Sequence, residues 1–169
     1  MTISTDVPTA EPLRPGTPGT TGALVTTCRV PGAATAGAYA VVEHTLAPGA
    51  LAAPPHRHSR EDEVSVVLDG VLTVWAGGRA FSAGPGEVVR KPRGEFHTFW
   101  NEGPAPVRLL EIISPAGFEH YFDELAAFVP ADAPPDVGAI MALAGRYGLE
   151  VDMASVGPLL ARHGLQFGR

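Results

Sequence analysis

The sequence predicts an all-β fold, a sandwich or barrel, with a helical tail at its C-terminal end. Seventeen prolines and twenty glycines in 169 residues supply a turn every few residues. The runs between these turns are short and apolar, and residues 64–68 and 71–76 flank Asp69-Gly70, a typical hairpin turn. After residue 114, apolar residues recur at helical spacing instead.

The chain divides into three expected parts. Residues 1–22 are rich in Thr, Pro and Gly without periodicity, which is typical of a flexible or strapping arm. Residues 23–115 hold the expected barrel, and residues 116–169 form a helical extension packed on it. The expected strands cover residues 23–29, 38–46, 64–68, 71–76, 79–82, 87–91, 95–100 and 107–113.

The tail predicts three helices. Ser114-Pro115 is typical of an N-cap followed by proline at the first helical position. After a linker over residues 130–135, helices are expected over residues 136–147 and 155–163, as a lid on the barrel or a dimer contact. The aromatic face of the first helix predicts packing, with cofactor stacking as the alternative: Phe118, Tyr121, Phe122, Leu125 and Phe128.

Composition and charge narrow the class of partner. A net charge of −6 argues against nucleic acid and against an anionic membrane. No apolar run reaches the roughly 18 residues of a membrane span. The first residues lack the positive and apolar regions of a secretory signal, so we expect a cytoplasmic protein. The single cysteine, Cys28, excludes an intramolecular disulfide.

The stretch from His56 to Glu63 is the first half of a candidate site. On an extended strand, His56 and His58 point to the same side. Glu63 follows at an odd spacing and reaches that side only if the chain turns or bulges over residues 59–62. Taken alone, the stretch fits a charged surface loop better than a metal site. Glu61 and Asp62 compete with Glu63, and we expect both to be solvated.

A third histidine comes from a second cluster, Gly86-x5-Pro92-x-Gly94-x2-His97-x3-Asn101. Three imidazoles and one carboxylate suit a single divalent first-row metal ion in catalysis, with positions left open for water, oxygen or substrate. Iron, manganese, nickel, cobalt, copper and zinc all accept such ligands.

These two clusters resemble the two cupin motifs. The first motif corresponds to His56-x-His58-x4-Glu63-x6-Gly70, and the second matches from Gly86 to Asn101, fifteen residues further on. One departure is Gly49, which precedes His56 by six intervening residues where the family usually has five. Pro54-Pro55-His56-Arg57-His58 and the tail beginning Ser114-Pro115-Ala116-Gly117-Phe118 are similar to small bacterial quercetin dioxygenase-like cupins.

The resemblance implies a single-domain cupin, a double-stranded β-helix of the jelly-roll type with an α-helical tail. It also implies that His56, His58, Glu63 and His97 are the metal ligands, with Glu63 able to act as base. Gly70, Gly86, Pro92 and Gly94 would be turn residues, and Asn101 a structural residue. Cupins of this size are often homodimers, which we therefore expect here.

Other residues are candidates for the pocket. Glu95 shares a strand face with His97, where it could act as acid or base or lie on the rim. Ser65 and Val67 share the face of Glu63, where Ser65 either binds substrate or fills space. Phe99 is a candidate pocket wall. His44 enters the cavity or lies exposed on its strand, and Trp75 belongs to the pocket or to the core.

Three classes of function are compatible with these residues. The first is a dioxygenase-type enzyme acting with O2 on a small organic molecule, possibly aromatic, flavonol-like or polyketide-like. The second uses the ion without oxygen, as a metal-assisted isomerase, cyclase or decarboxylase. The third is a non-catalytic protein that binds a small molecule through the same site.

Overall fold

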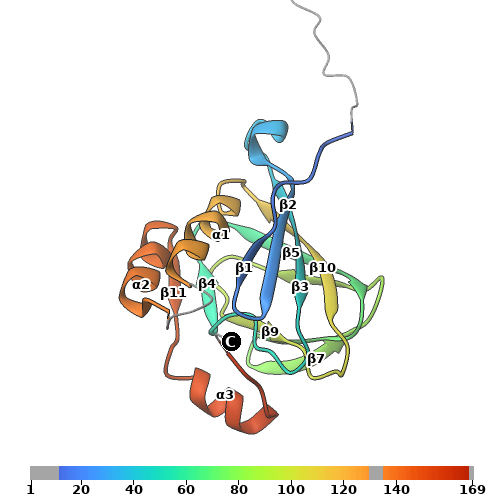
Figure 1. Ribbon diagram of the computed structural model, residues 1–169, viewed down its shortest axis with the longest axis vertical. Helices are drawn as coiled ribbons and strands as arrows, with labels where there is room; N and C mark the ends of the chain where they lie inside the picture. The colour runs from blue at the N-terminus through green and yellow to red at the C-terminus, as the bar shows by residue number, and fades with distance from the viewer. Residues whose placement is uncertain (1–11, 130–134, 168–169) are drawn as a thin grey trace, which may run out of the picture.

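Two antiparallel β-sheets face each other and enclose the core. The computed structural model describes residues 12–129 and 135–167. The six-stranded sheet has the order β1-β2-β3-β10-β5-β8, and the five-stranded sheet has the order β11-β4-β9-β6-β7 (Figure 1). The first sheet consists of β1 (Gly19–Thr21), β2 (Leu24–Val30), β3 (Ala40–Leu46), β10 (Val107–Ser114), β5 (Asp62–Asp69) and β8 (Val88–Lys91). The second consists of β11 (Leu149–Val151), β4 (His56–His58), β9 (His97–Trp100), β6 (Leu72–Ala76) and β7 (Arg79–Ala83).

The expected strands of the barrel are all present, within a few residues. The hairpin between β5 and β6 turns at Gly70, whose φ of 77° favours glycine. A Cβ there would lie 2.9 Å from Val107 Cγ2, so the turn also packs too closely for a side chain. The strand β4 is the extended segment on which His56 and His58 were expected to point to one side, whereas β11, of only three residues, was not expected.

The main core lies between the sheets. Alternate residues of each strand point inward, and on β10 they are Val107, Leu109, Glu111 and Ile113. The largest apolar cluster joins both sheets and includes Leu46, Val67, Leu72, Val74 and Leu109. One polar residue, Glu111, therefore occupies an otherwise apolar stripe.

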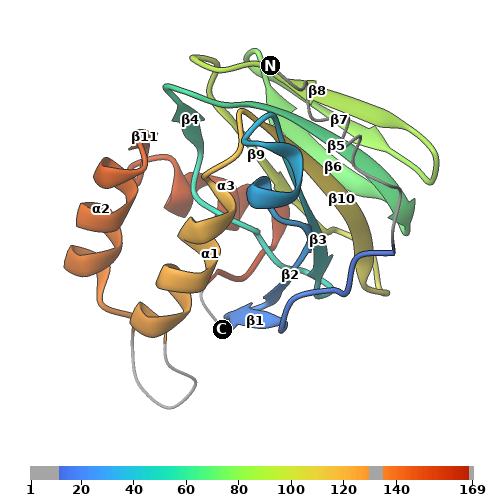
Figure 2. The same ribbon diagram turned by 90° about the horizontal axis from the view of Figure 1, so that it is seen from above.

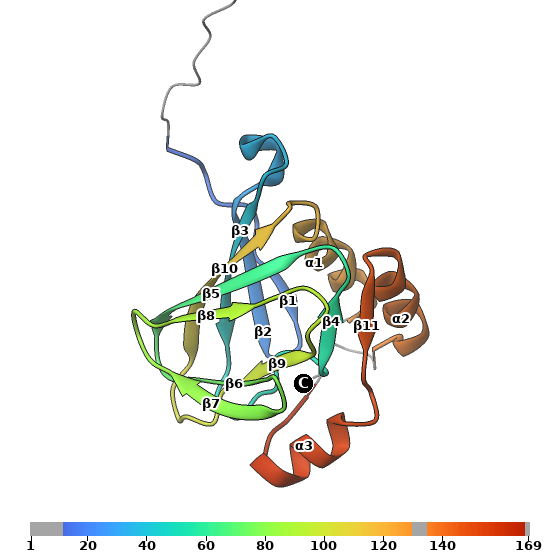
Figure 3. The ribbon, with the colours of Figure 1, turned by 180° about the vertical axis from the view of Figure 1, so that it is seen from behind.

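Three helices cover one end and one side of the sandwich. The helix α1 (Glu119–Leu125) lies beside α2 (Val137–Arg146) next to β4 and β11, as Figure 2 shows. The helix α3 (Val156–His163) lies below β9 in Figure 3. Trp100 packs between the sheet and α3, together with Leu51, Val156 and Leu165. Among the described residues, no helix is long and apolar enough to cross a membrane.

The helix ends test the predicted boundaries. Asp136 caps α2 by accepting a hydrogen bond from the Ala139 amide, and Gly164 ends α3 in the left-handed conformation, as expected. The predicted cap at Ser114-Pro115 is wrong. Ser114 is the last residue of β10, paired with Asp62, because the strand outlasts its apolar run by one residue. The helix begins only at Glu119.

The expected arm and linker are described only in part. Residues 1–11 and 130–134 lie outside the described residues. Within the rest of the arm, Gly19–Thr21 forms β1, which pairs with β2, so this part is a strand of the sheet and not a flexible segment. The Gly- and Ala-rich connection after β2 contains a short 3-10 helix, Gly32–Thr35.

Candidate metal centre

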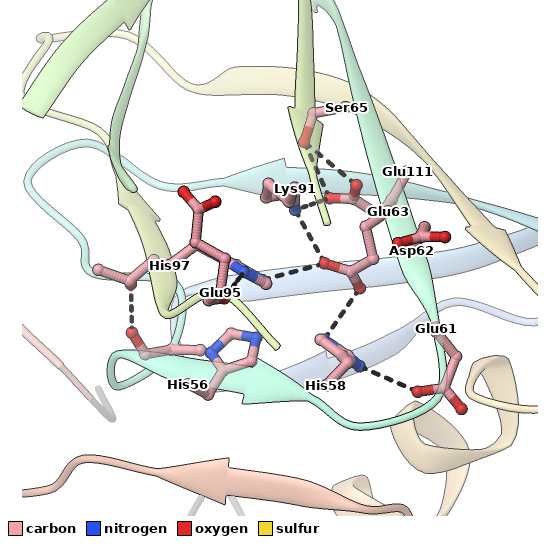
Figure 4. A network of polar contacts seen from close by, with 12 residues as sticks. His56, His58, Glu61, Asp62, Glu63, Ser65, Lys91, Glu95, His97 and Glu111 are labelled. Carbon is pink, nitrogen blue, oxygen red and sulfur yellow. Dashed lines mark hydrogen bonds and ion pairs between the residues drawn. The ribbon is translucent and has the colours of Figure 1, made fainter. Parts of the chain in front are cut away.

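Four side chains from three strands meet inside the sandwich. His56 and His58 come from β4, His97 begins β9, and Glu63 is the second residue of β5. One possible ligand atom from each lies within 4.8 Å of the others. The turn over residues 59–61 carries the chain from one sheet to the other. Glu63 therefore faces the imidazoles, as the odd spacing required (Figure 4).

The imidazole rings are held by their Nδ1 atoms. His56 Nδ1 lies 2.8 Å from the Pro54 carbonyl oxygen, and His97 Nδ1 lies 3.1 Å from that of Glu95. A ring nitrogen facing a carbonyl oxygen must be the donor, so in its neutral form each ring carries the proton on Nδ1 and leaves Nε2 unprotonated. This leaves Nε2 as the ligand atom on each ring.

His58 has a different partner. Its Nδ1 lies 3.4 Å from Glu61 Oε2, and its Nε2 lies 3.3 Å from Glu63 Oε1. Glu61 is only 5% exposed, so the expectation that it is solvated is wrong. The short turn points its carboxylate back at the ring (Figure 4). Asp62 points away and pairs with Arg93, as expected of a surface residue.

The donor set is compatible with a divalent metal ion. Buried polar atoms almost always have partners, yet His58 Nε2 and His97 Nε2 make no hydrogen bond to the described residues. In His56 and His97 an oxygen atom holds Nδ1 and leaves Nε2 free to bind a metal. Imidazoles arranged in this way, together with one carboxylate, match the ligands of catalytic first-row metals. When ionised, the buried side chains near the cluster carry a formal charge of −2, which a divalent cation would balance. They are three carboxylates and one ammonium: Glu61, Glu63, Glu111 and Lys91.

Burial and neighbouring charges set the protonation states. Burial, with the nearby His97 and His58, lowers the pKa of His56 to about 3, although Glu63 acts to raise it. Burial also lowers the pKa of His97. For Glu63, burial alone would raise the pKa, but Lys91, His58 and His97 outweigh it and hold the pKa well below its usual value. Neutral imidazoles at His56 and His97 and an ionised Glu63 are the protonation states that a metal ion needs of these ligands.

A buried ion-pair network lies behind Glu63. Lys91 Nζ is 3.1 Å from Glu63 Oε2 and 2.7 Å from Glu111 Oε2, and Ser65 donates to both Glu111 oxygens at 3.1 Å (Figure 4). Burial would lower the pKa of Lys91, but Glu111 and Glu63 raise it. Burial raises the pKa of Glu111 to about 7 despite Lys91.

Sequence reasoning missed Lys91 and Glu111. The signal was present, because each is a charged residue at an inward position of a strand whose other inward residues are apolar. Ser65 is buried as a partner of Glu111. It is not among the residues that line the cavity next to the cluster, which lies between the sandwich and the helical tail. Val67 belongs to the core between the sheets and does not line the cavity either.

Two further candidates lie away from the cavity. Glu95 offers its backbone carbonyl to His97, while its carboxylate extends toward Gly77 and points away from Glu63 (Figure 4). Trp75 lies on the outer side of β6, because the inward position is taken by Val74, and it packs against α3. Neither residue lines the cavity.

The cluster opens into a cavity of about 180 Å³ between the sandwich and the helical tail. Its polar lining includes His56, Glu63, Lys91 and Glu111, and Phe99 forms part of its wall, as expected. The aromatic face of α1 both packs and lines this space, since Phe118, Tyr121 and Phe122 belong to an apolar cluster and to the cavity. Most of the wall is apolar, for example Leu24, Leu51, Ile140, Leu149 and Met153.

His44 also lines the cavity. It is 2% exposed and bonds to Thr26 on the neighbouring strand, so it is not an exposed strand residue. Burial, together with the charge of Lys91, lowers the pKa of His44 to about 4. The carboxylates of Glu63 and Glu43 act to raise this pKa but do not outweigh burial.

Removing the Glu61 carboxylate should weaken metal binding without abolishing it. The loss of a partner that orients a ligand ring lowers metal affinity by about 10- to 100-fold. We expect this loss for Glu61→Ala and a smaller one for Glu61→Gln, whose amide oxygen can still face His58 Nδ1 at the position of Glu61 Oε2. Competition with a chromogenic chelator measures the affinity. Asp62→Ala is the matched control, and an affinity loss as large as that of Glu61→Ala would contradict this role of Glu61.

The metal-free protein should lose stability below neutral pH, in part through His44. In the unfolded chain this imidazole binds a proton near pH 6.5, but in the folded chain only near pH 4. The unfolded state therefore binds more protons in this range, and acid favours unfolding. Between pH 7 and pH 5 the free energy of unfolding should fall by about 2 kcal/mol more in the wild type than in His44→Phe. Urea denaturation in EDTA measures the free energy of unfolding. An equal decrease in the wild type and in His44→Phe would contradict a neutral His44.

Comparison with known proteins supports the same fold. Residues 42–113 match the family described as Cupin domain. Among solved structures, KdgF from Halomonas sp. is 19% identical with a TM-score of 0.52, over 58% of this chain and 84% of its own. A predicted oxalate decarboxylase from Thermotoga maritima is 22% identical with a TM-score of 0.52, over 54% of this chain and 80% of its own. No curated protein matches the chain.

These similarities agree with the two facing antiparallel sheets of this structure. At these identities the solved structures speak for the fold alone. The chain has the cupin fold, and its residues 42–113 match the family model described as Cupin domain.

Proposed function

We propose that this protein is a metal-dependent enzyme that acts on a small, largely apolar organic molecule, with dioxygenase-type oxidation as its reaction. The observation that carries the proposal is the position of the cluster. Two of its members, His56 and Glu63, line a cavity whose remaining wall is mostly apolar. Catalytic sites commonly combine an apolar pocket with a few convergent polar groups.

The wall of the cavity narrows the substrate class. Lys91 is the one lysine or arginine among the described lining residues, and both Glu63 and Glu111 already pair with it. No free cation of the described wall is thus available for a phosphate or a carboxylate. The aromatic rings of Phe99, Phe118 and Phe122 instead favour a ring-bearing substrate of low charge.

Each side chain of the cluster has a role in this proposal. His56, His58, His97 and Glu63 would hold the ion, which when bound would supply Lewis acidity and, if redox-active, electron transfer to O2. Lys91 fixes the orientation of Glu63 and keeps it ionised. Glu63 is the carboxylate placed to accept a proton from a substrate hydroxyl. The apolar wall excludes water and strengthens these interactions.

A second reaction class has one observation in its favour. Lys91 and Glu111 form a buried acid–base pair directly behind Glu63, and both line the cavity. Such a pair suits proton transfer in a metal-assisted isomerisation, cyclisation or decarboxylation that does not use oxygen. The two reaction classes differ in whether O2 is consumed.

Removing a ligand histidine should abolish both metal binding and turnover. The test uses protein loaded with each of iron, manganese, cobalt, nickel, copper and zinc, and measures metal content and oxygen uptake with a flavonol and a catechol. His56→Ala, His58→Ala and His97→Ala should lose stoichiometric metal and all uptake, because each removes one of the four donors on which tight binding in this geometry depends. Cooperative thermal unfolding should persist, because the apolar cluster between the sheets does not involve the ion.

His120→Ala is the matched control, because His120 lies exposed on α1 and should change neither property. Turnover that continues without oxygen would contradict the dioxygenase and favour the second class. Metal-dependent binding of the small molecule without formation of any product would contradict both enzyme classes and favour a non-catalytic binding protein. Metal content that is unchanged in His97→Ala would contradict the site itself.

A further inference from the structure

His44 is a polar residue of the described cavity wall that the proposed metal site leaves unused, and the inference that follows rests on the proposed function. It lies on β3 and faces Thr26, its cross-strand partner on β2. Thr26 Oγ1 is 2.9 Å from His44 Nδ1, and both side chains are buried. This contact uses one ring nitrogen and leaves Nε2 for a molecule in the cavity.

The hydrogen bond with Thr26 selects one tautomer of His44. If Nδ1 carried the proton, the Thr26 hydroxyl would accept it, and its own hydrogen would face no acceptor among the described side chains. If Nδ1 is bare, the hydroxyl donates to it, and the ring carries its proton on Nε2. We take this second arrangement, because it pairs the Thr26 hydroxyl and leaves only the Nε2–H of His44 to be paired by a molecule in the cavity.

The ring of His44 is also fixed in position. Its centroid is 5.1 Å from that of Phe122 at 69°, and 6.3 Å from that of Phe99. One of these rings comes from the helical tail and the other from β9. The imidazole therefore presents its Nε2–H from a rigid, otherwise apolar wall. It is neutral at physiological pH, because burial lowers its pKa to about 4.

We propose that His44 selects the ligand of this cavity by donating a hydrogen bond from Nε2–H to a carbonyl oxygen of an apolar, ring-bearing molecule. A neutral donor on an apolar wall suits a neutral acceptor, whereas an anion would need a charged partner. A hydrocarbon of the same shape would leave the donor unpaired, and this penalty is the source of the selection.

A matched pair of probes tests the selection. Fluorenone and fluorene share one three-ring shape and differ by a carbonyl oxygen. Equilibrium dialysis measures the Kd of each for the full-length protein, both in EDTA and loaded with redox-inert zinc. The ratio of the two Kd values isolates the carbonyl from general hydrophobicity. The metal-free measurement isolates His44 from the ion.

In metal-free protein, the preference for fluorenone should fall by roughly three- to tenfold in His44→Phe, the value of one neutral hydrogen bond. His44→Gln should retain most of the preference, because its amide can donate from nearly the same point. Thr26→Val keeps shape but loses the hydroxyl, and it should show an intermediate loss.

Histidine nitrogen NMR provides a readout independent of binding. The wild type should show His44 as the Nε2–H tautomer, and Thr26→Val should shift it toward a mixture. A wild-type Nδ1–H tautomer would overturn the inference. So would an unchanged fluorenone preference in His44→Phe, even if metal content and turnover agree with the proposed function. Failure of both probes to bind would instead contradict the apolar substrate class and the inference together.

Discussion

An ionised carboxylate buried between two sheets is the constraint on which the rest of this structure depends. Glu63 is 4% exposed, and burying its charge would be costly without partners. Its oxygens lie 3.1–3.3 Å from Lys91, His97 and His58. Lys91 in turn is balanced by Glu111. The interior is thus organised by charge around the cluster and by apolar packing elsewhere, and a divalent ion would complete the balance of charge.

The helical extension is part of the site and not an appendage. The strand β4 carries two of the four cluster residues, yet it meets β9 through one residue pair, His56 and His97. On its other side β11 pairs with all three of its residues, with Leu149 opposite His58. The ring of Phe118, just before α1, packs against His58 with centroids 4.5 Å apart. The tail therefore holds the ligand strand in place and closes the cavity above it.

The strands of the barrel follow from local spacing, whereas the meeting of His97 with His56, His58 and Glu63 was implied by the resemblance to the two cupin motifs. Alternation and turn residues predict strands, and the odd spacing before Glu63 predicts the turn between sheets. What the sequence could not supply were contacts between distant segments. The burial of Glu61 depends on the path of a three-residue turn, and the partner of His44 depends on the register of β2 and β3. The short strand β11 forms only because β4 has a free edge.

The central claim is that three imidazoles and Glu63 bind one divalent ion, and X-ray absorption of the purified, metal-loaded protein tests it most directly. The account predicts three imidazole ligands per metal and oxygen donors in the remaining positions, at roughly 2.0–2.2 Å for zinc. Substitution of any one of the three histidines by alanine is expected to remove the bound metal and, with it, this spectrum. A spectrum without imidazole scattering, or one that His97→Ala leaves unchanged, would contradict the claim.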